Sequence, residues 1–386
     1  MRKTTDVAIV GGGVIGCSIA YQLARRGIEC TVFEQGRFAS GASGATGGII
    51  GPLWYVDRAI DPYFKLGMRS LEMFSTLAAE LQEAGVDPEF RQNGILKPAL
   101  TPELLQSLKD NLSWQGEMGL GVRWLDRDEM IEREPEIHPD VLGGVFSPQE
   151  GCVRGKSFVD SLVHAGSKLG AKFLEGTAVT GLEMEGRNVT GVRTALDVFN
   201  TEHTILASGP WVGVAGAWIP EGIPVRPVKG QRVLLRRTGF LPRCTVQNVI
   251  PQVDGNVLVG ATREESAFDQ AITVAGVRQV TESAMAVFPV LRDAELVAAQ
   301  AGVRPGSPDG VPIMGPIPGW EGLSVASGHD HAGIMLSPAT GEMMADFIAT
   351  SDATDLEPFS VSRFAPEGES QGYVAQPLFT NVTHER

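Results

Sequence analysis

Basic residues are scarce in this sequence. Lys and Arg together number 32 against 46 Asp and Glu, so the formal net charge is −14. A chain of this charge repels the phosphates of nucleic acids and of anionic membranes, and we expect neither as a partner. An anionic substrate would therefore need a local positive group to hold it.

Cysteines are also few and scattered. Cys17, Cys30, Cys152 and Cys244 form no CxxC pair, which argues against a zinc site and against a disulfide framework. No apolar run approaches about 20 residues, and the N-terminus leads directly into an apolar strand, so we expect no membrane span and no signal peptide. The prediction is a cytoplasmic protein with reduced thiols and no metal site.

The length and the apolar content are those of an ordinary globular protein. The chain has 386 residues, of which 43% are hydrophobic, and it contains no internal repeat. Domains of the usual size would divide such a chain into two.

The glycine cluster at residues 11–16 is the most informative pattern. The apolar residues 7–10 before it predict a strand, and the apolar spacing after it predicts a helix. Gly11 permits a tight turn, Gly13 lets a pyrophosphate approach the backbone, and Gly16 lets the helix pack on the strand. The amides at the helix N-terminus are then available to phosphate.

An acidic residue follows at the expected place. A second strand is predicted at residues 28–33, and Glu34 comes directly after it. A carboxylate there can accept both ribose hydroxyls of an adenosine group. The whole order predicts a dinucleotide site, and the alternative is a glycine-rich turn that holds no ligand.

Small residues dominate the next segment, residues 40–51. They cannot build a core of their own, but they let a flat ring system and a pyrophosphate lie against the backbone. A flexible linker is the alternative, although a linker would not need Ile49 and Ile50. We favour a cofactor-binding loop.

Later segments predict further elements. A buried strand is expected at residues 204–209 and several strands at 231–260. Ser157 and Ser337 are expected to cap two helices, the second with Pro338 in its first position. Residues 365–386 are polar and lack periodicity, so we expect a tail.

Taken in order, these motifs resemble the amino-acid and amine oxidase family of FAD flavoproteins, which includes glycine oxidase, sarcosine oxidase and D-amino acid oxidase. The resemblance covers residues 6–364 and is strongest to glycine oxidases. The motifs that carry it are residues 11–16, 33–34, 45–51, 206–211, 228–230, 259–262, 301–306, 309–312 and 328–341.

The resemblance implies a mixed α/β (α+β) fold with two domains. A discontinuous, Rossmann-like FAD-binding domain would comprise residues 1–85, 150–222 and 300–364. A substrate domain with a mostly antiparallel β-sheet would comprise residues 86–149 and 223–299 and cover the flavin.

The resemblance also implies which residues bind the cofactor. They are Gly11, Gly13, Val14, Ile15, Gly16, Glu34, Gln35, Ala42, Ser43, Gly47, Gly48, Ile49, Val179, Ser208, Gly209, Trp211, Arg304, His329, Asp330, His331, Ala332, Gly333, Ile334 and Met335. Monomeric sarcosine oxidases attach their flavin to a cysteine just before the last glycine-rich loop. No cysteine lies near Arg304, so we expect the FAD to be bound non-covalently.

Three residues are candidates for the catalytic site. Arg304 matches the arginine that grips the substrate carboxylate in this family, because a guanidinium forms two charge-assisted bonds to a carboxylate. A surface ion pair is the alternative for Arg304. His331, in the loop predicted to cover the flavin, either lines the substrate pocket or only packs there. Asn248 is the third candidate.

Two of these positions depart from glycine oxidases. Asn248 aligns with a tyrosine that helps to hold the carboxylate of glycine, and His331 aligns with an arginine. Both changes enlarge the predicted pocket, which favours an N-substituted (N-carboxymethyl) glycine over plain glycine. The family reaction would convert the CH–N bond into an imine, which hydrolyses to glyoxylate and an amine, while molecular oxygen is reduced to hydrogen peroxide.

Three classes of function remain open. The protein is an oxidase, a dehydrogenase that passes electrons from sarcosine or a D-amino acid to another acceptor, or an FAD-binding scaffold without catalysis. The oligomeric state is open as well, and a homo-oligomer is one option.

Overall fold

Residues 3–55, 61–117, 119, 121–215, 218–220, 222–265 and 267–364 are described by the computed structural model. They form two units, each assembled from separate stretches of the chain. Unit 1 takes its residues from Met1–Phe38, Leu162–Pro227 and Arg304–Arg386, and unit 2 from Ala39–Ser161 and Val228–Val303. The expected tail, residues 365–386, lies outside the described residues.

These units differ from the expected domains mainly at residues 39–85 and 150–161, which belong to unit 2. The two stretches hold together through a short antiparallel pair, β4 (Ile49–Ile50) with β8 (Gly151–Cys152). Which unit binds the cofactor and which the substrate stays a prediction.

A six-stranded sheet forms the centre of unit 1. Its strands, in spatial order, are β20 (Ile313–Pro316), β21 (Leu323–Ser327), β13 (His203–Leu206), β2 (Val7–Val10), β3 (Cys30–Phe33) and β9 (Lys172–Leu174). All neighbours are parallel except β20 and β21. Every residue of β2, β3 and β21 is buried, as expected for strands covered on both faces.

The parallel arrangement decides where unit 1 can bind a ligand. The strand β2 has β3 on one side and β13 on the other, so the strand order reverses at β2. In sheets of this type, ligands bind at the carboxyl ends of the strands, next to such a reversal. The loops that follow β2, β3, β13 and β21 lie at that edge.

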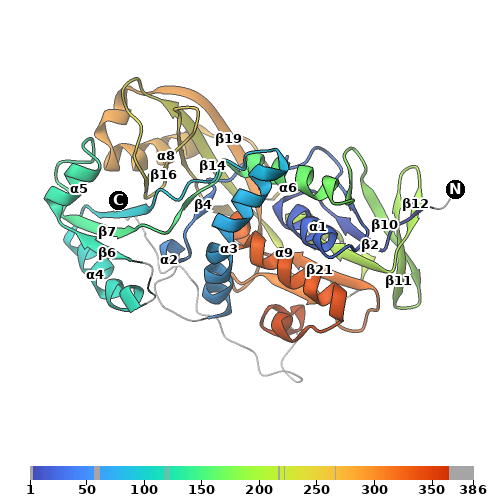
Figure 1. Cartoon of the computed structure of the whole chain (residues 1–386). Helices are drawn as coiled ribbons and strands as arrows, with labels where there is room; N and C mark the ends of the chain where they lie inside the picture. The colour runs from blue at the N-terminus through green and yellow to red at the C-terminus, as the bar shows by residue number, and fades with distance from the viewer. Residues whose placement is uncertain are drawn as a thin grey trace. The chain divides into compact units, whose positions relative to one another are not determined.

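Two helices of unit 1 pack against each other (Figure 1). The helix α1 (Val14–Arg25) follows β2, and the helix α9 (Gly333–Thr350) follows the loop after β21. Ser18 donates a hydrogen bond to the carbonyl of Ser337 at 2.8 Å. A 3-10 turn, η4 (Asp330–Ala332), precedes α9.

The predicted start of α9, with Ser337 as cap and Pro338 as first residue, is wrong, because the first helical residue is Gly333, five residues before Pro338. Proline has no N–H to donate to the carbonyl of Ile334. The hydroxyl of Ser337 donates to that carbonyl at 2.9 Å, which satisfies it inside the helix.

The remaining elements of unit 1 flank this core. A four-stranded sheet contains β1 (Lys3–Thr4), β12 (Val198–Asn200), β11 (Asn188–Thr194) and β10 (Val179–Glu185). Short helical segments are η1 (Gly209–Trp211), α7 (Val212–Ala215), η5 (Thr354–Phe359) and η6 (Val361–Phe364).

A nine-stranded sheet is the framework of unit 2. Its strands are β18 (Glu264–Glu265), β14 (Arg226–Arg236), β17 (Val257–Gly260), β16 (Val249–Pro251), β15 (Thr245–Val246), β5 (Ile95–Ala99), β7 (Gly143–Ser147), β6 (Arg123–Leu125) and β19 (Glu295–Gly306), which pairs with β14. The pairs with a determined register are antiparallel, apart from β15 with β5. The expected mixed fold with a mostly antiparallel sheet is confirmed.

Helices α4 (Pro102–Glu117), α5 (Arg127–Arg133) and α8 (Val274–Val287) pack against strands of this sheet. Other helical segments of unit 2 are α2 (Pro52–Tyr55), α3 (Pro62–Ala84) and η3 (Pro289–Asp293), while α6 (Gly155–Lys168) contains a boundary between the units. Val280, Ala284 and Val287 of α8 pack into one apolar cluster with the strands. The predicted cap at Ser157 is wrong, since α6 begins at Gly155 and Ser157 instead donates to Glu89 at 2.6 Å.

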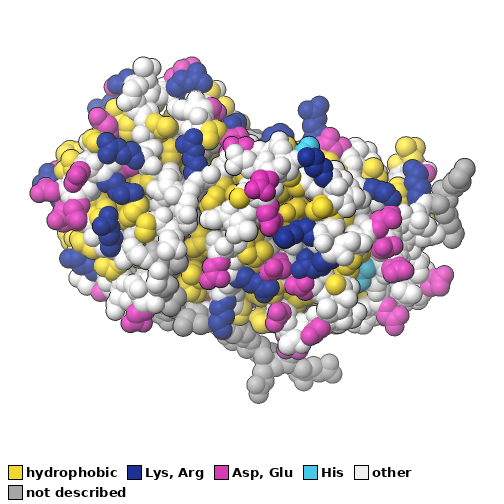
Figure 2. Space-filling model, viewed as in Figure 1, with side chains coloured by type: hydrophobic (Ala, Val, Ile, Leu, Met, Phe, Trp, Pro, Cys, Tyr) yellow, Lys and Arg dark blue, Asp and Glu magenta, His cyan; other side chains and the backbone are white. Residues whose placement is uncertain are grey.

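The surface shows mixed charge. Acidic and basic side chains are interspersed over the face that Figure 2 shows. Within the described residues, no helix is both long enough and apolar enough to cross a membrane.

Candidate functional site

The glycine turn of unit 1 has the close backbone packing that its sequence predicted. Gly11 has a φ of +119°, and a Cβ on it would lie 2.5 Å from the carbonyl oxygen of Ala207. A Cβ on Gly16 would overlap the carbonyl oxygen of Gly11. Gly13 is the N-cap of α1 and makes no side-chain capping bond. The turn is therefore a cradle of main-chain groups at the start of a helix, which suits a pyrophosphate.

Glu34 lies against this turn. One carboxylate oxygen accepts from the amide of Gly12 at 2.8 Å, and the other accepts from the amide of Gly36 at 2.7 Å. Each oxygen keeps a second lone pair, so the half-buried carboxylate can still accept ribose hydroxyls. Gln35, the next residue, is exposed.

Val179 lies in the strand that follows this region. The amide of Thr177 donates to the carbonyl of Glu34 at 2.8 Å, which keeps the start of β10 close to the acid. Val179 is half-buried and packs against the cluster that includes Phe33. The contact of Val179 with the cofactor stays a prediction.

The turn after β13 meets the same edge. Ser208 is the N-cap residue before η1, and a Cβ on Gly11 would lie 2.7 Å from its Cα. Ser327 at the end of β21 donates to the carbonyl of Gly209 at 2.9 Å. Trp211 is half-buried and closes η1, with its amide donating to the carbonyl of Ser208 at 3.2 Å.

The loop after β21 contains two histidines in different settings. His329 is fully buried, and its Nε2 lies 3.1 Å from the hydroxyl of Thr340. Burial lowers the pKa of His329 to about 3, so the ring is neutral and serves as a packing and hydrogen-bonding group. His331 is 19% exposed, and its Nδ1 lies 3.6 Å from a carboxylate oxygen of Asp330.

The rest of this loop leads into α9. Asp330 has a φ of +47° and is buried, as is Ala332. Gly333 begins the helix, and Ile334 and Met335 are buried in its first turn.

Arg304 is near this loop in the fold of unit 1. It lies in β19, two residues before Gly306, and Gly306 forms an antiparallel bridge with His329. The structure thus brings the half-buried arginine alongside the loop that contains His329 and His331.

The small-residue loop lies in unit 2. Gly48 has a φ of +71° and bonds through its carbonyl to the amide of Val153 at 2.8 Å. Ile49 pairs with Cys152. Ala42, Ser43 and Gly47 are half-buried in the turns before them.

Asn248 is also in unit 2, whereas Arg304 and His331 are in unit 1. It forms a two-residue turn with Gln247 between β15 and β16. Its amide nitrogen donates to Ser283 of α8 at 2.7 Å, and its buried carbonyl oxygen has no partner among the described residues. The side-chain carbonyl oxygen of Asn248 is therefore a free acceptor among the described residues, and one of its two amide N–H groups is engaged by Ser283.

Two residues that the sequence did not indicate hold the short helix α2. Glu150 is fully buried and accepts from the amide of Leu53 at 2.7 Å. Lys97 donates to the carbonyls of Leu53 and Trp54 at 3.2 and 2.6 Å. Burial raises the pKa of Glu150 to about 7, and the charge of Lys97 opposes that rise. No sequence motif links residues so far apart in the chain.

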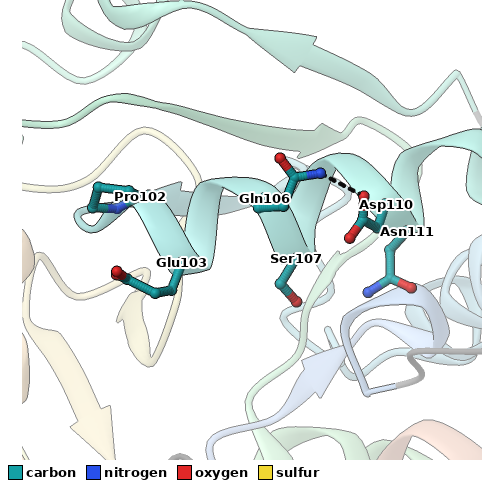
Figure 3. A pocket seen from close by; sticks show the side chains of 6 residues that line it. All are labelled: Pro102, Glu103, Gln106, Ser107, Asp110 and Asn111. Carbon is teal, nitrogen blue, oxygen red and sulfur yellow. Dashed lines mark hydrogen bonds between the residues drawn. The ribbon is translucent and has the colours of Figure 1, made fainter.

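A depression of about 660 Å³ lies on α4 and is lined by Pro102, Glu103, Gln106, Ser107, Asp110 and Asn111 (Figure 3). Gln106 donates to Asp110 one turn later at 2.7 Å. All lining residues come from one helix and none is a predicted site residue, so this depression is the polar outer face of α4. Among the described residues, no cluster of three or more His, Cys, Asp or Glu is arranged to hold a metal ion.

Comparison with known proteins agrees with this geometry. The family described as DAO, FAD dependent oxidoreductase, matches residues 6–347. The chain belongs to this family.

Among its relatives, glycine oxidase from Geobacillus kaustophilus is 35% identical over 372 residues, which are 94% of this chain and 98% of that protein. The crystal structure of that species' glycine oxidase has a TM-score of 0.88 at 33% identity and covers 95% and 100% of the two chains. The crystal structure of iminodiacetate oxidase from Chelativorans sp. BNC1 has a TM-score of 0.85 at 26% identity and covers 92% and 98%.

The protein is thus an FAD-dependent oxidoreductase related to glycine oxidases. Unit 1 fits the cofactor on its own features, because the glycine turn is a cradle that a Cβ would fill and the adjacent helix has no side-chain cap. The individual contacts to FAD remain predictions.

Proposed function

We propose that this protein is an FAD-dependent oxidase that acts on glycine or an N-carboxymethyl amine. The CH–N bond is oxidised to an imine, the imine hydrolyses to glyoxylate and an amine, and molecular oxygen is reduced to hydrogen peroxide. The observation that carries the proposal is the position of Arg304 beside the loop of His329, through the bridge between Gly306 and His329.

Several segments would contribute to holding the cofactor. In unit 1, the glycine turn would bind the pyrophosphate and Glu34 the ribose, while the amides that lead into α9 would stabilise negative charge on the ring. In unit 2, the loop of residues 42–49 would contact the flavin. FAD, when bound, supplies the acceptor for two electrons.

Arg304 would hold the substrate carboxylate through a two-bond clamp, which fixes the Cα–H with respect to the cofactor. His331 would line the pocket. No general base is required if the amine binds in its neutral form.

The comparison with iminodiacetate oxidase supports the N-carboxymethyl class. Iminodiacetate is a glycine that carries a second carboxymethyl group on nitrogen. The same chemistry would suit the two replacements of larger side chains, by Asn248 and by His331, that the alignment with glycine oxidases predicts. Asn248 would accept a hydrogen bond from the nitrogen substituent through its carbonyl oxygen, which has no partner among the described residues, while Ser283 engages one of its two N–H groups.

The test is a panel of glycine, sarcosine and iminodiacetate. Each is mixed anaerobically with the yellow holoenzyme, and bleaching of the flavin is recorded. Peroxide release in air then separates an oxidase from a dehydrogenase. We expect bleaching and peroxide with at least one compound, and the highest kcat/KM with iminodiacetate. Bleaching without peroxide would indicate a dehydrogenase, and no bleaching would contradict the catalytic proposal.

The clamp has its own control. Arg304→Ala should keep its FAD but lose roughly a hundredfold or more in kcat/KM, or about 3 kcal/mol of transition-state binding. Arg304→Lys keeps the charge without the planar fork and should recover little. Unchanged efficiency in Arg304→Ala would place the clamp elsewhere. Acid precipitation should release free FAD, as a non-covalent cofactor requires.

A further inference from the structure

One arginine in unit 2 binds the backbone of the small-residue loop. Residues 38–45 form a series of turns with few internal hydrogen bonds. Among these, the amides of Gly44 and Ala45 donate to the carbonyl of Gly41 at 3.2 and 3.3 Å. Arg232, on β14, reaches this loop from almost 190 residues away in sequence and bonds two of its carbonyls. The loop's own small side chains cannot reach these carbonyls to donate hydrogen bonds to them.

The guanidinium of Arg232 has three partners. Its Nη2 donates to the carbonyl of Gly44 at 2.8 Å and to Oε1 of Gln300 on β19 at 2.6 Å. Its Nη1 donates to the carbonyl of Thr46. A planar group with donors in fixed directions can join two strands and a loop in this way, whereas a lysine ammonium is a single point of charge.

The loop also packs closely on its neighbours in unit 2. A Cβ on Gly302 would lie 2.5 Å from the Cβ of Ala45, and a Cβ on Gly155 would overlap the carbonyl oxygen of Ser43. A small shift of the loop would therefore produce a clash. The bonds from Arg232 select one position within this narrow space.

The charge of Arg232 persists at neutral pH. Burial, together with the nearby charge of Arg154, lowers the pKa of Arg232 to about 10. Arg154 is itself 3.6 Å from carboxylate oxygens of Glu89 and Asp254.

We propose that Arg232 is a positioning residue that holds residues 42–49 in the conformation that receives FAD. The proposal rests on the cofactor role proposed above for this loop. Arg232 acts through the carbonyls of Gly44 and Thr46 and need not touch the cofactor.

Arg232→Lys tests this in the full-length protein. Apoprotein is titrated with FAD, and the dissociation constant is read from the quenching of flavin fluorescence. We expect the constant to rise roughly tenfold to a hundredfold, because charge-assisted bonds to two carbonyls are lost. The control is Arg236→Lys on the same strand, since Arg236 bonds Asn256 at 2.9 Å and not the loop. The control should bind FAD as the wild type does.

Chemical rescue separates positioning from general destabilisation. In Arg232→Ala, added guanidinium ion at low concentration should restore part of the FAD affinity and the wild-type shape of the visible flavin band. It should have no such effect on Arg236→Ala. If Arg232→Ala does not fold, Gln300→Leu removes one partner of the guanidinium and should weaken FAD binding several-fold.

A loop variant distinguishes the two proposals. Gly48→Ala disturbs the loop directly, because Gly48 has a positive φ and its Cβ would overlap the carbonyl oxygen of Val153. Weaker FAD binding in Gly48→Ala with unchanged binding in Arg232→Lys would overturn the role of Arg232 and keep that of the loop. Unchanged binding in both would overturn both.

Discussion

Unit 1 and unit 2 bury different kinds of polar group. Most buried polar residues of unit 1 carry hydroxyls, such as Ser18, Thr204 and Ser327, and its predicted pyrophosphate contacts are main-chain groups around glycines. Unit 2 buries charged side chains, including Glu150 and Lys229. Lys229 is 2% exposed and lies 2.9 Å from a carboxylate oxygen of Asp269.

The difference predicts which kind of substitution disrupts the packing or the polar contacts of each region. Where main-chain segments pack closely at a glycine, a substitution that adds a Cβ disrupts the packing, because there is no room for the extra atom. A loop held by buried charges fails when a charge or a donor is removed, because its partner is left without compensation. The glycine turn of unit 1 and the buried charged contacts of unit 2 should therefore respond to opposite kinds of substitution.

The largest effect is expected in unit 1 from adding one methyl group. Gly11→Ala places a Cβ 2.5 Å from the carbonyl oxygen of Ala207 and forces alanine to a φ of +119°. Overpacking and backbone strain together should cost about 4 kcal/mol of unfolding free energy, and FAD should no longer bind. Urea unfolding and FAD titration measure the two effects.

Gly27→Ala is the matched control for the backbone term. Gly27 also has a positive φ, +72°, but a Cβ there would meet nothing within 4 Å. We expect a cost of about 1 kcal/mol and normal FAD binding. Equal losses in the two variants would show that close approach at Gly11 contributes nothing.

The next effect concerns a buried charge in unit 2. Burial raises the pKa of Glu150 from 4.5 to about 7, so the folded protein holds a proton that the unfolded chain has already lost in this pH range. A raised pKa in the folded state gives stability that is full below about pH 4.5 and is lost as the pH rises to about 7. The loss from this group should be about 3 kcal/mol.

Glu150→Gln should flatten this part of the stability profile, measured by urea unfolding of FAD-saturated protein at several pH values. The exposed Glu136 is the control, and Glu136→Gln should keep the wild-type slope. Lys97→Met should shift the loss to higher pH, because the charge of Lys97 lowers the pKa of Glu150. A wild-type slope in Glu150→Gln would assign the pH dependence to other groups.

These variants also show which features could be predicted from sequence. The turn at residues 11–16 and the acid at Glu34 lie within one βαβ segment, and glycine is required there by the backbone itself. Short motifs of this kind can be recognised in a single sequence. The helix start at Gly333 was missed, because the hydroxyl of Ser337 compensates for proline in a way that capping rules do not anticipate.

The residues that form the long-range hydrogen bonds of unit 2 could not be predicted from the sequence. Glu150 binds an amide 97 residues away, and Arg232 binds a carbonyl 186 residues away. Such partners meet only when the sheet has formed, and their residue types are those of ordinary surface positions. The same holds for the bond between Asn248 and Ser283, which depends on how α8 packs.

A smaller effect is expected for Glu34, whose role combines both kinds of contact. Glu34→Gln keeps the size of the side chain but loses the charge that accepts from Gly12 and Gly36. FAD affinity should fall about tenfold, or about 1.4 kcal/mol, while the rate at saturating FAD stays near that of the wild type. FAD titration and steady-state rates measure the two. An unchanged FAD affinity would contradict the ribose assignment.

The smallest effect is expected for a charge pair that is not buried. Lys156 and Asp160 of unit 2 lie one helical turn apart with 2.6 Å between their charged atoms, a shorter distance than that between Lys229 and Asp269. Their side chains are 63% and 43% exposed, so water screens the pair and holding two mobile side chains costs entropy. A double-mutant cycle with Lys156→Met and Asp160→Asn should give a coupling of about 0.4 kcal/mol in urea unfolding. A coupling well above about 1 kcal/mol would mean that short distance alone makes an ion pair strong, and burial would no longer explain why unit 2 depends on its internal charges.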